Sequence, residues 1–108
     1  MPEDLDAVFK ALADPSRRRI LDELRDTDGL SVTEIAALLP QMTRFGVMKH
    51  LGVLEQAALV VTRKDGRRTL HHLNPVPIAL VADRWLQPYR EHHAASLIPL
   101  KRVLEERP

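Results

Sequence analysis

Six side chains that can bind a polyanion are concentrated in one short stretch of this sequence. Residues 43–72 contain six lysines and arginines but only two acidic residues, a local balance of +4, whereas the whole chain carries +1. Residues 1–42 carry −4 and residues 73–108 carry +1. Such a cluster attracts phosphate polyanions through its local field and not through net charge. The six cations are Arg44, Lys49, Arg63, Lys64, Arg67 and Arg68.

The pattern around the first of these cations predicts two helices joined by a tight turn. Ser31 and Glu34 have the spacing of a capping box, which starts the first helix, and Pro40 ends it. Thr43 is then the N-cap of a second helix. We interpret residues 31–57 as a helix-turn-helix.

The second helix has one apolar side and one mixed side. At about 100° per residue, its apolar side chains fall within a narrow arc that we expect to be buried. Gly46 and Gly52 each disfavour the helix by about 1 kcal/mol relative to Ala. They suit a helix whose exposed side approaches another backbone closely. The residues of the buried arc are Val47, Leu51, Leu54 and Ala58.

The mixed side of this helix carries groups that can read base edges in a major groove. Arg44 and Lys49 could donate hydrogen bonds to guanine, while Phe45 and Met48 could contact thymine methyl groups. Two alternatives stay open from the residues alone. Phe45 and Met48 could pack against the preceding helix, or they could form an apolar patch that docks another protein.

The remaining cations surround a predicted β-hairpin. Residues 59–64 are rich in β-branched side chains and predict a strand, and residues 69–73 predict its partner. Asp65-Gly66 is a hairpin signal, because the tight turn needs a positive φ. We interpret residues 59–73 as a wing. A cationic wing after a helix-turn-helix indicates binding to duplex DNA, and a solvated hairpin without a partner is the alternative.

A further helix is predicted from residue 14 to about residue 26. Asp14 is a good N-cap acceptor, and Pro15 suits the first helical position because its missing N–H has no intrahelical partner there. Arg17 and Arg18 lie near the start of this helix. They could add contacts to DNA phosphates.

Apolar periodicity predicts helices at both ends of the chain, at residues 4–13 and from residue 77 onward. Their faces hold more apolar surface than a small domain can easily cover. We therefore expect residues 1–26 and 75–108 to form a two-fold dimer interface, with an intramolecular core as the alternative. Pro88 and Pro99 predict that the last helix is kinked or broken. The expected interface residues are Leu5, Val8, Phe9, Val81, Trp85, Leu86 and Tyr89.

Length and composition narrow the class of protein. With 108 residues and 44% hydrophobic residues, we expect a single domain over residues 1–108. No apolar run approaches the roughly 20 residues of a membrane-spanning helix, and the N-terminus does not resemble a secretory signal. The absence of cysteine excludes disulfides and thiolate metal sites, and it fits a reducing cytoplasm. No nucleophile motif or glycine-rich phosphate loop is present, so we expect neither catalysis nor a cofactor.

Three segments in combination resemble the ArsR-type winged-helix repressors. The resemblance covers about residues 5–85 and implies a mainly α fold with a small β-hairpin, that is, an α+β winged helix-turn-helix. It also implies a homodimer paired through its first and last helices, which binds an inverted-repeat operator. The segments are residues 11–21 (ALADPSRRRIL), residues 43–55 (TRFGVMKHLGVLE), and residues 58–60 with the Gly66-Arg67-Arg68 wing.

Two features depart from that family. Met48 stands where a small hydroxyl residue is usual, and Phe45 where Pro or a small residue is common, so no base preference is carried over. Many members sense metals through a Cys-x-Cys pair, which this chain lacks. Asp83, His92 and His93 are the candidates for a metal site of the kind other members build on the last helix. They lack the Asp-x-His start of those sensors, and a site across the dimer is an alternative.

Overall fold

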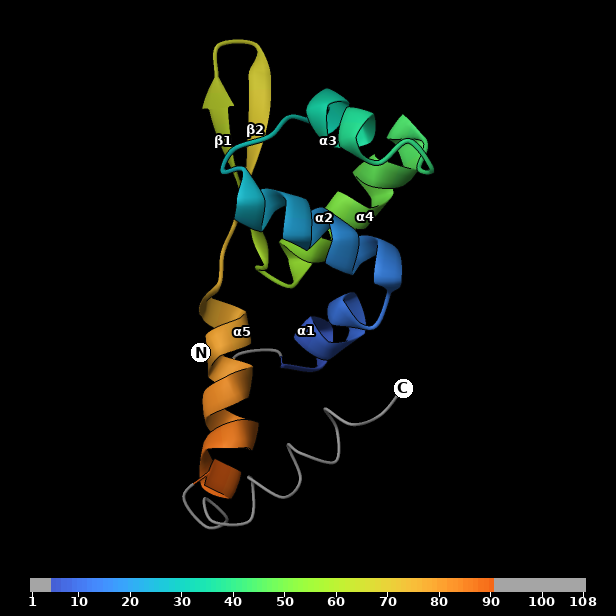
Figure 1. Cartoon of the computed structure of the whole chain (residues 1–108). Helices are drawn as coiled ribbons and strands as arrows, with labels where there is room; N and C mark the ends of the chain where they lie inside the picture. The colour runs from blue at the N-terminus through green and yellow to red at the C-terminus, as the bar shows by residue number, and fades with distance from the viewer. Residues whose placement is uncertain (1–4, 91–108) are drawn as a thin grey trace. The chain divides into compact units, whose positions relative to one another are not determined.

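A computed structural model describes residues 5–90, which divide between two units, residues 1–78 and residues 79–108. The single-domain organisation stays a prediction, and each unit is described by itself. The elements of the first unit are α1 (Leu5–Leu12), α2 (Pro15–Asp26), α3 (Val32–Leu38), α4 (Arg44–Gln56), β1 (Val60–Asp65) and β2 (Arg68–Leu73) (Figure 1). Helix α5 (Val76–Val81) crosses the boundary between the units. This element order confirms the predicted winged helix-turn-helix.

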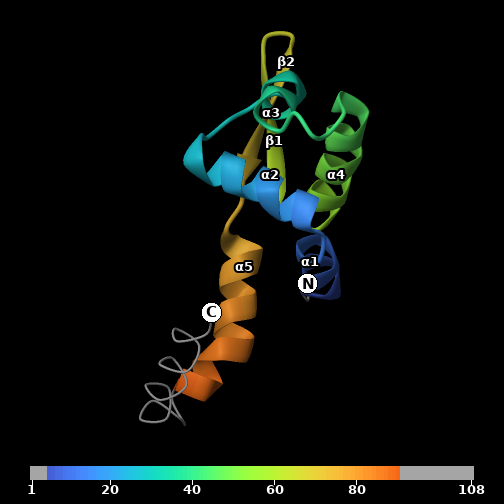
Figure 2. The ribbon, with the colours of Figure 1, turned by 45° about the vertical axis from the view of Figure 1, so that its right-hand side comes forward.

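Helix α2 is the centre of the first unit. It contacts α1, α3, α4 and β2, and α4 also contacts α1, α3 and β1 (Figure 2). Its start is as predicted, because Asp14 Oδ2 accepts a hydrogen bond from the Arg17 N–H at 3.0 Å and Pro15 is the first helical residue. That backbone hydrogen bond is the main reason why the pKa of Asp14 is lowered.

One apolar core holds these helices together. Among its fully buried side chains, Ile20 and Leu24 come from α2, Ile35 from α3, and Leu51 and Leu54 from α4. Burial of such a side chain stabilises the fold by about 1.5–3 kcal/mol. Val8 belongs to the same core.

The placement of Val8 corrects one expectation for the dimer interface. Its side chain is only 3% exposed, so it packs inside the protomer and offers no surface to a second copy. Its neighbours on the predicted face differ, because Phe9 is exposed and Leu5 is half-buried.

The end of α4 also differs from the prediction. Ala57 is buried, while Ala58 is exposed and adopts a left-handed conformation with φ +60°. The N–H of Ala58 donates to the carbonyl of Glu55, and the N–H of Leu59 donates to that of Leu54. This pair of bonds is a Schellman motif with alanine where glycine is usual. The helix therefore stops before Ala58, which leaves the buried arc.

The wing is an antiparallel hairpin whose turn lies one residue later than predicted. Asp65 pairs with Arg68 in the ladder, so the two turn residues are Gly66 and Arg67. Gly66 has φ +64°, which matches a type II′ turn with glycine at its first central position. The prediction of Asp65-Gly66 was wrong because cross-strand pairing, and not the dipeptide, sets the register.

The base of the wing is joined to the loop between α2 and α3. The N–H of Leu30 donates to the carbonyl of His71 at 3.1 Å, and the N–H of His71 donates to that of Leu30 at 2.8 Å. His71 is buried, and its Nδ1 donates to the same Leu30 carbonyl at 2.9 Å. The loop and β2 are therefore held together at this point.

The described part of the second unit, residues 79–90, is helical. A π-helical turn, Ala82–Leu86, follows α5, and the N–H of Gln87 donates to the carbonyl of Ala82. Helical residues continue on both sides of Pro88, so Pro88 does not break the helix. Pro99 lies outside the described residues. Within residues 5–90, no helix combines the length and apolarity required to cross a membrane.

The strained end of α4 generates a prediction about stability. Ala58→Gly should stabilise the protein by about 1 kcal/mol, because glycine adopts a left-handed conformation without the steric cost that an L side chain incurs. Urea unfolding should show a higher midpoint with an unchanged m-value. Ala57→Gly is the control, and it should destabilise because Ala57 is buried at a negative φ. Equal destabilisation by both variants would contradict this account.

Candidate nucleic-acid interface

Helix α4 presents a large apolar group and a cation on its outer side. Phe45 is 70% exposed and Met48 is 53% exposed, so the alternative in which they pack against α3 is not what the structure shows. The ammonium group of Lys49 lies 5.8 Å from the centroid of the Phe45 ring, one turn earlier. This cation–π contact supports the Lys49 stem over the ring. Directly behind them, Val47 and Leu51 anchor the helix in the core.

The start of α4 explains one of its two glycines. The hydroxyl of Thr43 accepts a hydrogen bond from the Gly46 N–H at 2.9 Å, which confirms Thr43 as the N-cap. A Cβ at Gly46 would lie 3.2 Å from that hydroxyl oxygen, so Gly46 serves the cap. A Cβ at Gly52 would meet nothing within 4 Å. Only Gly52 therefore leaves the exposed side of α4 open to close approach.

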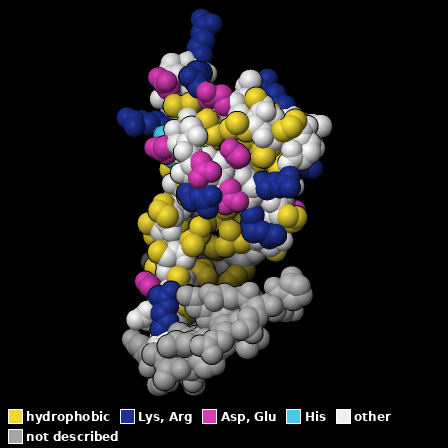
Figure 3. Space-filling model, viewed as in Figure 1, with side chains coloured by type: hydrophobic (Ala, Val, Ile, Leu, Met, Phe, Trp, Pro, Cys, Tyr) yellow, Lys and Arg dark blue, Asp and Glu magenta, His cyan; other side chains and the backbone are white. Residues whose placement is uncertain are grey.

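The wing exposes its cations to solvent. Arg63, Lys64, Arg67 and Arg68 are all exposed, and Lys and Arg side chains project from the end of the hairpin (Figure 3). Two of the four have partners within the protein. Lys64 donates to the Thr69 hydroxyl at 2.9 Å, and Arg68 donates to Glu34 Oε1 at 2.6 Å.

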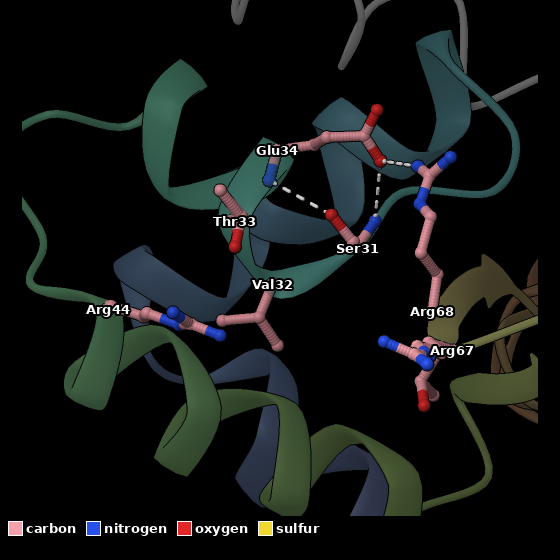
Figure 4. A pocket seen from close by; sticks show the side chains of 8 residues that line it. Ser31, Val32, Thr33, Glu34, Arg44, Arg67 and Arg68 are labelled. Atoms are coloured by element: carbon pink, nitrogen blue, oxygen red, sulfur yellow. Dashed lines mark hydrogen bonds and ion pairs between the residues drawn. The ribbon is translucent and has the colours of Figure 1, made fainter.

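An open groove of about 580 Å³ lies between the wing and the helix-turn-helix (Figure 4). Arg44 at the start of α4 and Arg67 at the wing turn both line it, so the fold brings together cations 23 positions apart in the sequence. Its only acidic lining residue, Glu34, is already bound to Arg68. Phosphate oxygens suit such a surface. The full lining is Ser31, Val32, Thr33, Glu34, Arg44, Arg67, Arg68 and Thr69.

Glu34 belongs to this surface although sequence reasoning assigned it only a capping role. The capping box with Ser31 is present, which confirms that prediction. The same carboxylate also binds Arg68, which lies 34 residues further along the chain. No local pattern signals a contact of that separation.

Arg17 has a structural role, which gives no support to its predicted contact with phosphate. Its guanidinium donates to the carbonyls of Ala11 at 2.8 Å and Lys10 at 3.0 Å, and it lies 3.4 Å from His50 Nδ1. These bonds satisfy carbonyls at the end of α1, where a cation is favoured. Arg18 donates to the Leu12 carbonyl but is exposed, so its phosphate contact stays a prediction.

Large apolar side chains are exposed on the first and last described helices. Trp85 is 52% exposed and Tyr89 is 61% exposed, and Phe9 and Leu86 are exposed as well. Val81 is half-buried. These positions are the surviving candidates for the interface with a second copy.

The metal candidates gain no support in the described part of the chain. Asp83 is exposed, and His92 and His93 lie outside the described residues. Among residues 5–90, no group of three or more His, Asp or Glu side chains is arranged to hold a metal ion.

An exposed helix held by two helices behind it, beside a cationic hairpin, defines a winged helix-turn-helix DNA-binding protein. Comparison with known proteins identifies the family of this DNA-binding protein. Residues 12–63 match the family described as a helix-turn-helix domain. The chain is 37% identical over 87 residues to YuzN, an uncharacterised HTH-type transcriptional regulator of Bacillus subtilis, covering 76% of this chain and 95% of YuzN. It is 34% identical over 67 residues to the transcriptional repressor SdpR of the same organism, covering 62% and 72%.

Solved structures agree with the sequence comparison. The ArsR-like transcriptional regulator from Rhodococcus sp. RHA1 is 30% identical, with a TM-score of 0.73 over 96% of this chain and 93% of that one. This chain belongs to the ArsR-type family of winged helix-turn-helix transcriptional regulators, a family that binds DNA. The predicted resemblance is confirmed.

An experiment can separate a structural role of Arg17 from a contact between Arg17 and a DNA phosphate. Arg17→Ala should lower the melting temperature, because it removes the donors that satisfy two carbonyls of α1. It should leave the salt dependence of DNA binding unchanged, since no phosphate contact is lost. Arg19→Ala is the matched control: it removes the same charge from an exposed position of the same helix and should not alter the melting temperature. A salt slope reduced by Arg17→Ala alone would restore a phosphate contact for Arg17.

Proposed function

We propose that the protein is a repressor that binds an inverted-repeat operator as a homodimer. The observation that carries the proposal is the two-sided character of α4. Its inner side is buried in the core, while Phe45, Met48 and Lys49 stand exposed on its outer side. A rigid helix with such an outer side fits the major groove.

The residues divide between reading bases and holding the backbone. Lys49 and Arg44 donate to guanine, and Phe45 and Met48 contact thymine methyl groups. The wing cations bind phosphates beside the groove, because exposed guanidinium and ammonium groups release counterions from DNA when they bind it. The Thr43 hydroxyl, which accepts the cap bond, keeps its proton for a phosphate oxygen. The wing residues in this role are Arg63, Lys64 and Arg67.

A homodimer gives the two copies of α4 the spacing of successive major grooves, about 34 Å. The exposed apolar side chains of α1 and of the last described helix support this assembly, because burying them against a second copy removes them from water. Occupation of an operator by such a dimer blocks transcription, and the likeness to a protein named a transcriptional repressor supports this direction of regulation. The interface residues of the proposal are Leu5, Phe9, Val81, Trp85, Leu86 and Tyr89.

Base reading and backbone binding make different predictions for two cations. For a duplex selected by the wild-type protein from a random pool, Lys49→Ala should lower affinity by about 10-fold or more, with a much smaller loss on random duplex. Arg67→Ala should weaken both complexes and reduce the salt slope by about 1. Filter binding over a range of salt concentrations measures both effects, with Lys10→Ala on α1 as the control. An equal loss on all sequences for Lys49→Ala would remove that residue from base reading.

The dimer interface is testable without DNA. Replacing Trp85 and Leu86 together by alanine should shift the protein from dimer to monomer at micromolar concentration in sedimentation equilibrium, because about two large apolar contacts per copy are lost. Arg90→Ala, on the same helical segment, should leave the dimer intact. A double variant that stays dimeric would exclude the last helix from the interface.

A further inference from the structure

Arg68 is the only wing cation with an acidic partner among the described residues. It begins β2 and pairs across the turn with Asp65 in the ladder. Its Nη2 lies 2.6 Å from Glu34 Oε1, and both side chains are about half exposed, at 52% and 45%. Figure 4 shows Arg68 reaching from the wing to Glu34 at the start of α3, away from the groove interior into which Arg67 points.

Glu34 is a fixed partner because the capping box holds it. The oxygen that binds Arg68 also accepts the Ser31 N–H at 2.9 Å, and the Glu34 N–H donates to the Ser31 hydroxyl at 3.2 Å. The Ser31 backbone N–H, and after it the Ser31 side chain, are the main causes of the lowered pKa of the Glu34 carboxyl group, and Arg68 adds to the effect. The carboxylate is therefore ionised and immobilised before any DNA arrives.

The chain from Leu30 to Glu34 contacts β2 at two points. His71 is bound through the backbone of Leu30, and Arg68 is bound through the side chain of Glu34. The two points are three residues apart, or roughly 10 Å along the strand. The loop and α3 thus brace both the base of the wing and its outer end.

The outer end of the wing needs such a brace. Every residue of β1 after Val60 is exposed, and Thr69 and Leu70 of β2 are only half-buried, so little packing supports the last part of the hairpin. A two-stranded hairpin without packing is marginally stable in water. An exposed ion pair adds little to global stability, so what the pair can supply is orientation.

We propose that Arg68 is a positioning residue that acts through Glu34. The pair fixes the wing against α3, so that Arg67 faces the groove and binds a phosphate of the duplex backbone there, while Arg68 itself makes no phosphate contact. The proposal rests on the DNA binding proposed above. It assigns the groove as the phosphate site and removes Arg68 from the residues that touch DNA.

The opposite role for Arg68 makes opposite predictions. If Arg68 left Glu34 to bind phosphate, the carboxylate would compete with DNA, and neutralising it would raise affinity. If the pair is a brace, neutralising either partner lowers affinity. Glu34→Gln is a suitable variant because glutamine at this position also closes a capping box.

The test measures binding of random duplex by Glu34→Gln, Arg68→Gln and the double variant over a range of salt concentrations. Each single variant should bind about 5-fold more weakly, within the range of couplings seen in ion-pair networks, and the double variant should be no worse than either. The salt slope should stay at the wild-type value. Arg67→Gln is the matched control at the adjacent residue, and it should reduce the slope by about 1.

A second measurement reports on the brace without DNA. The backbone amides of Gly66 and Arg67 should show lower ¹⁵N order parameters in Glu34→Gln and in Arg68→Gln than in the wild type, with unchanged values in β1 near Val60. A reduced salt slope for Arg68→Gln together with tighter binding by Glu34→Gln would overturn the proposal. So would additive losses with unchanged wing order. Absence of duplex binding by the wild-type protein at low salt would instead overturn the proposed function, and the phosphate site with it.

Discussion

The burial of one side of α4 is the constraint on which the rest of the structure depends. Leu51 and Leu54 are fully buried, and they meet a core supplied by Ile20 of α2 and Ile35 of α3. Because that side is held on several elements at once, the outer side can carry exposed apolar groups without collapsing inward. The exposure of Phe45 is thus a consequence of the packing behind it.

The helix N-caps, whose hydrogen-bond donors lie three residues later in the chain, were predicted well from the sequence. Asp14, Ser31 and Thr43 each accept the N–H of the residue three positions later, and this geometry depends on almost nothing beyond the first helical turn. The helix starts, the helix-turn-helix and the exposed side of α4 therefore followed from local residues. The cationic hairpin followed in outline for the same reason.

Structural features that depend on contacts with other parts of the fold could not be predicted from local sequence patterns. The hairpin turn lies one residue later than predicted because the pairing of Asp65 with Arg68 determines the register. Ala58 left the buried arc because α4 ends in a Schellman motif, although alanine gives no signal for a left-handed residue. The role of Arg17 depends on carbonyls of α1, six and seven residues earlier, and that of Arg68 on Glu34. In both arginines the charge was visible in the sequence but its partner was not.

The contact between Lys49 and Phe45 affects how the outer side of α4 would bind DNA. A free lysine side chain loses much rotamer freedom when it is fixed on a base. Lys49 already rests over the Phe45 ring, so part of that freedom is lost before binding. Phe45 cannot turn inward to the core, since Val47 and Leu51 occupy it. The proposed reading surface therefore contains an aromatic and cationic pair that is partly ordered before binding. Its base preference has to be derived from Phe45, Met48 and Lys49 themselves, since two of these positions differ from the usual residues of the family.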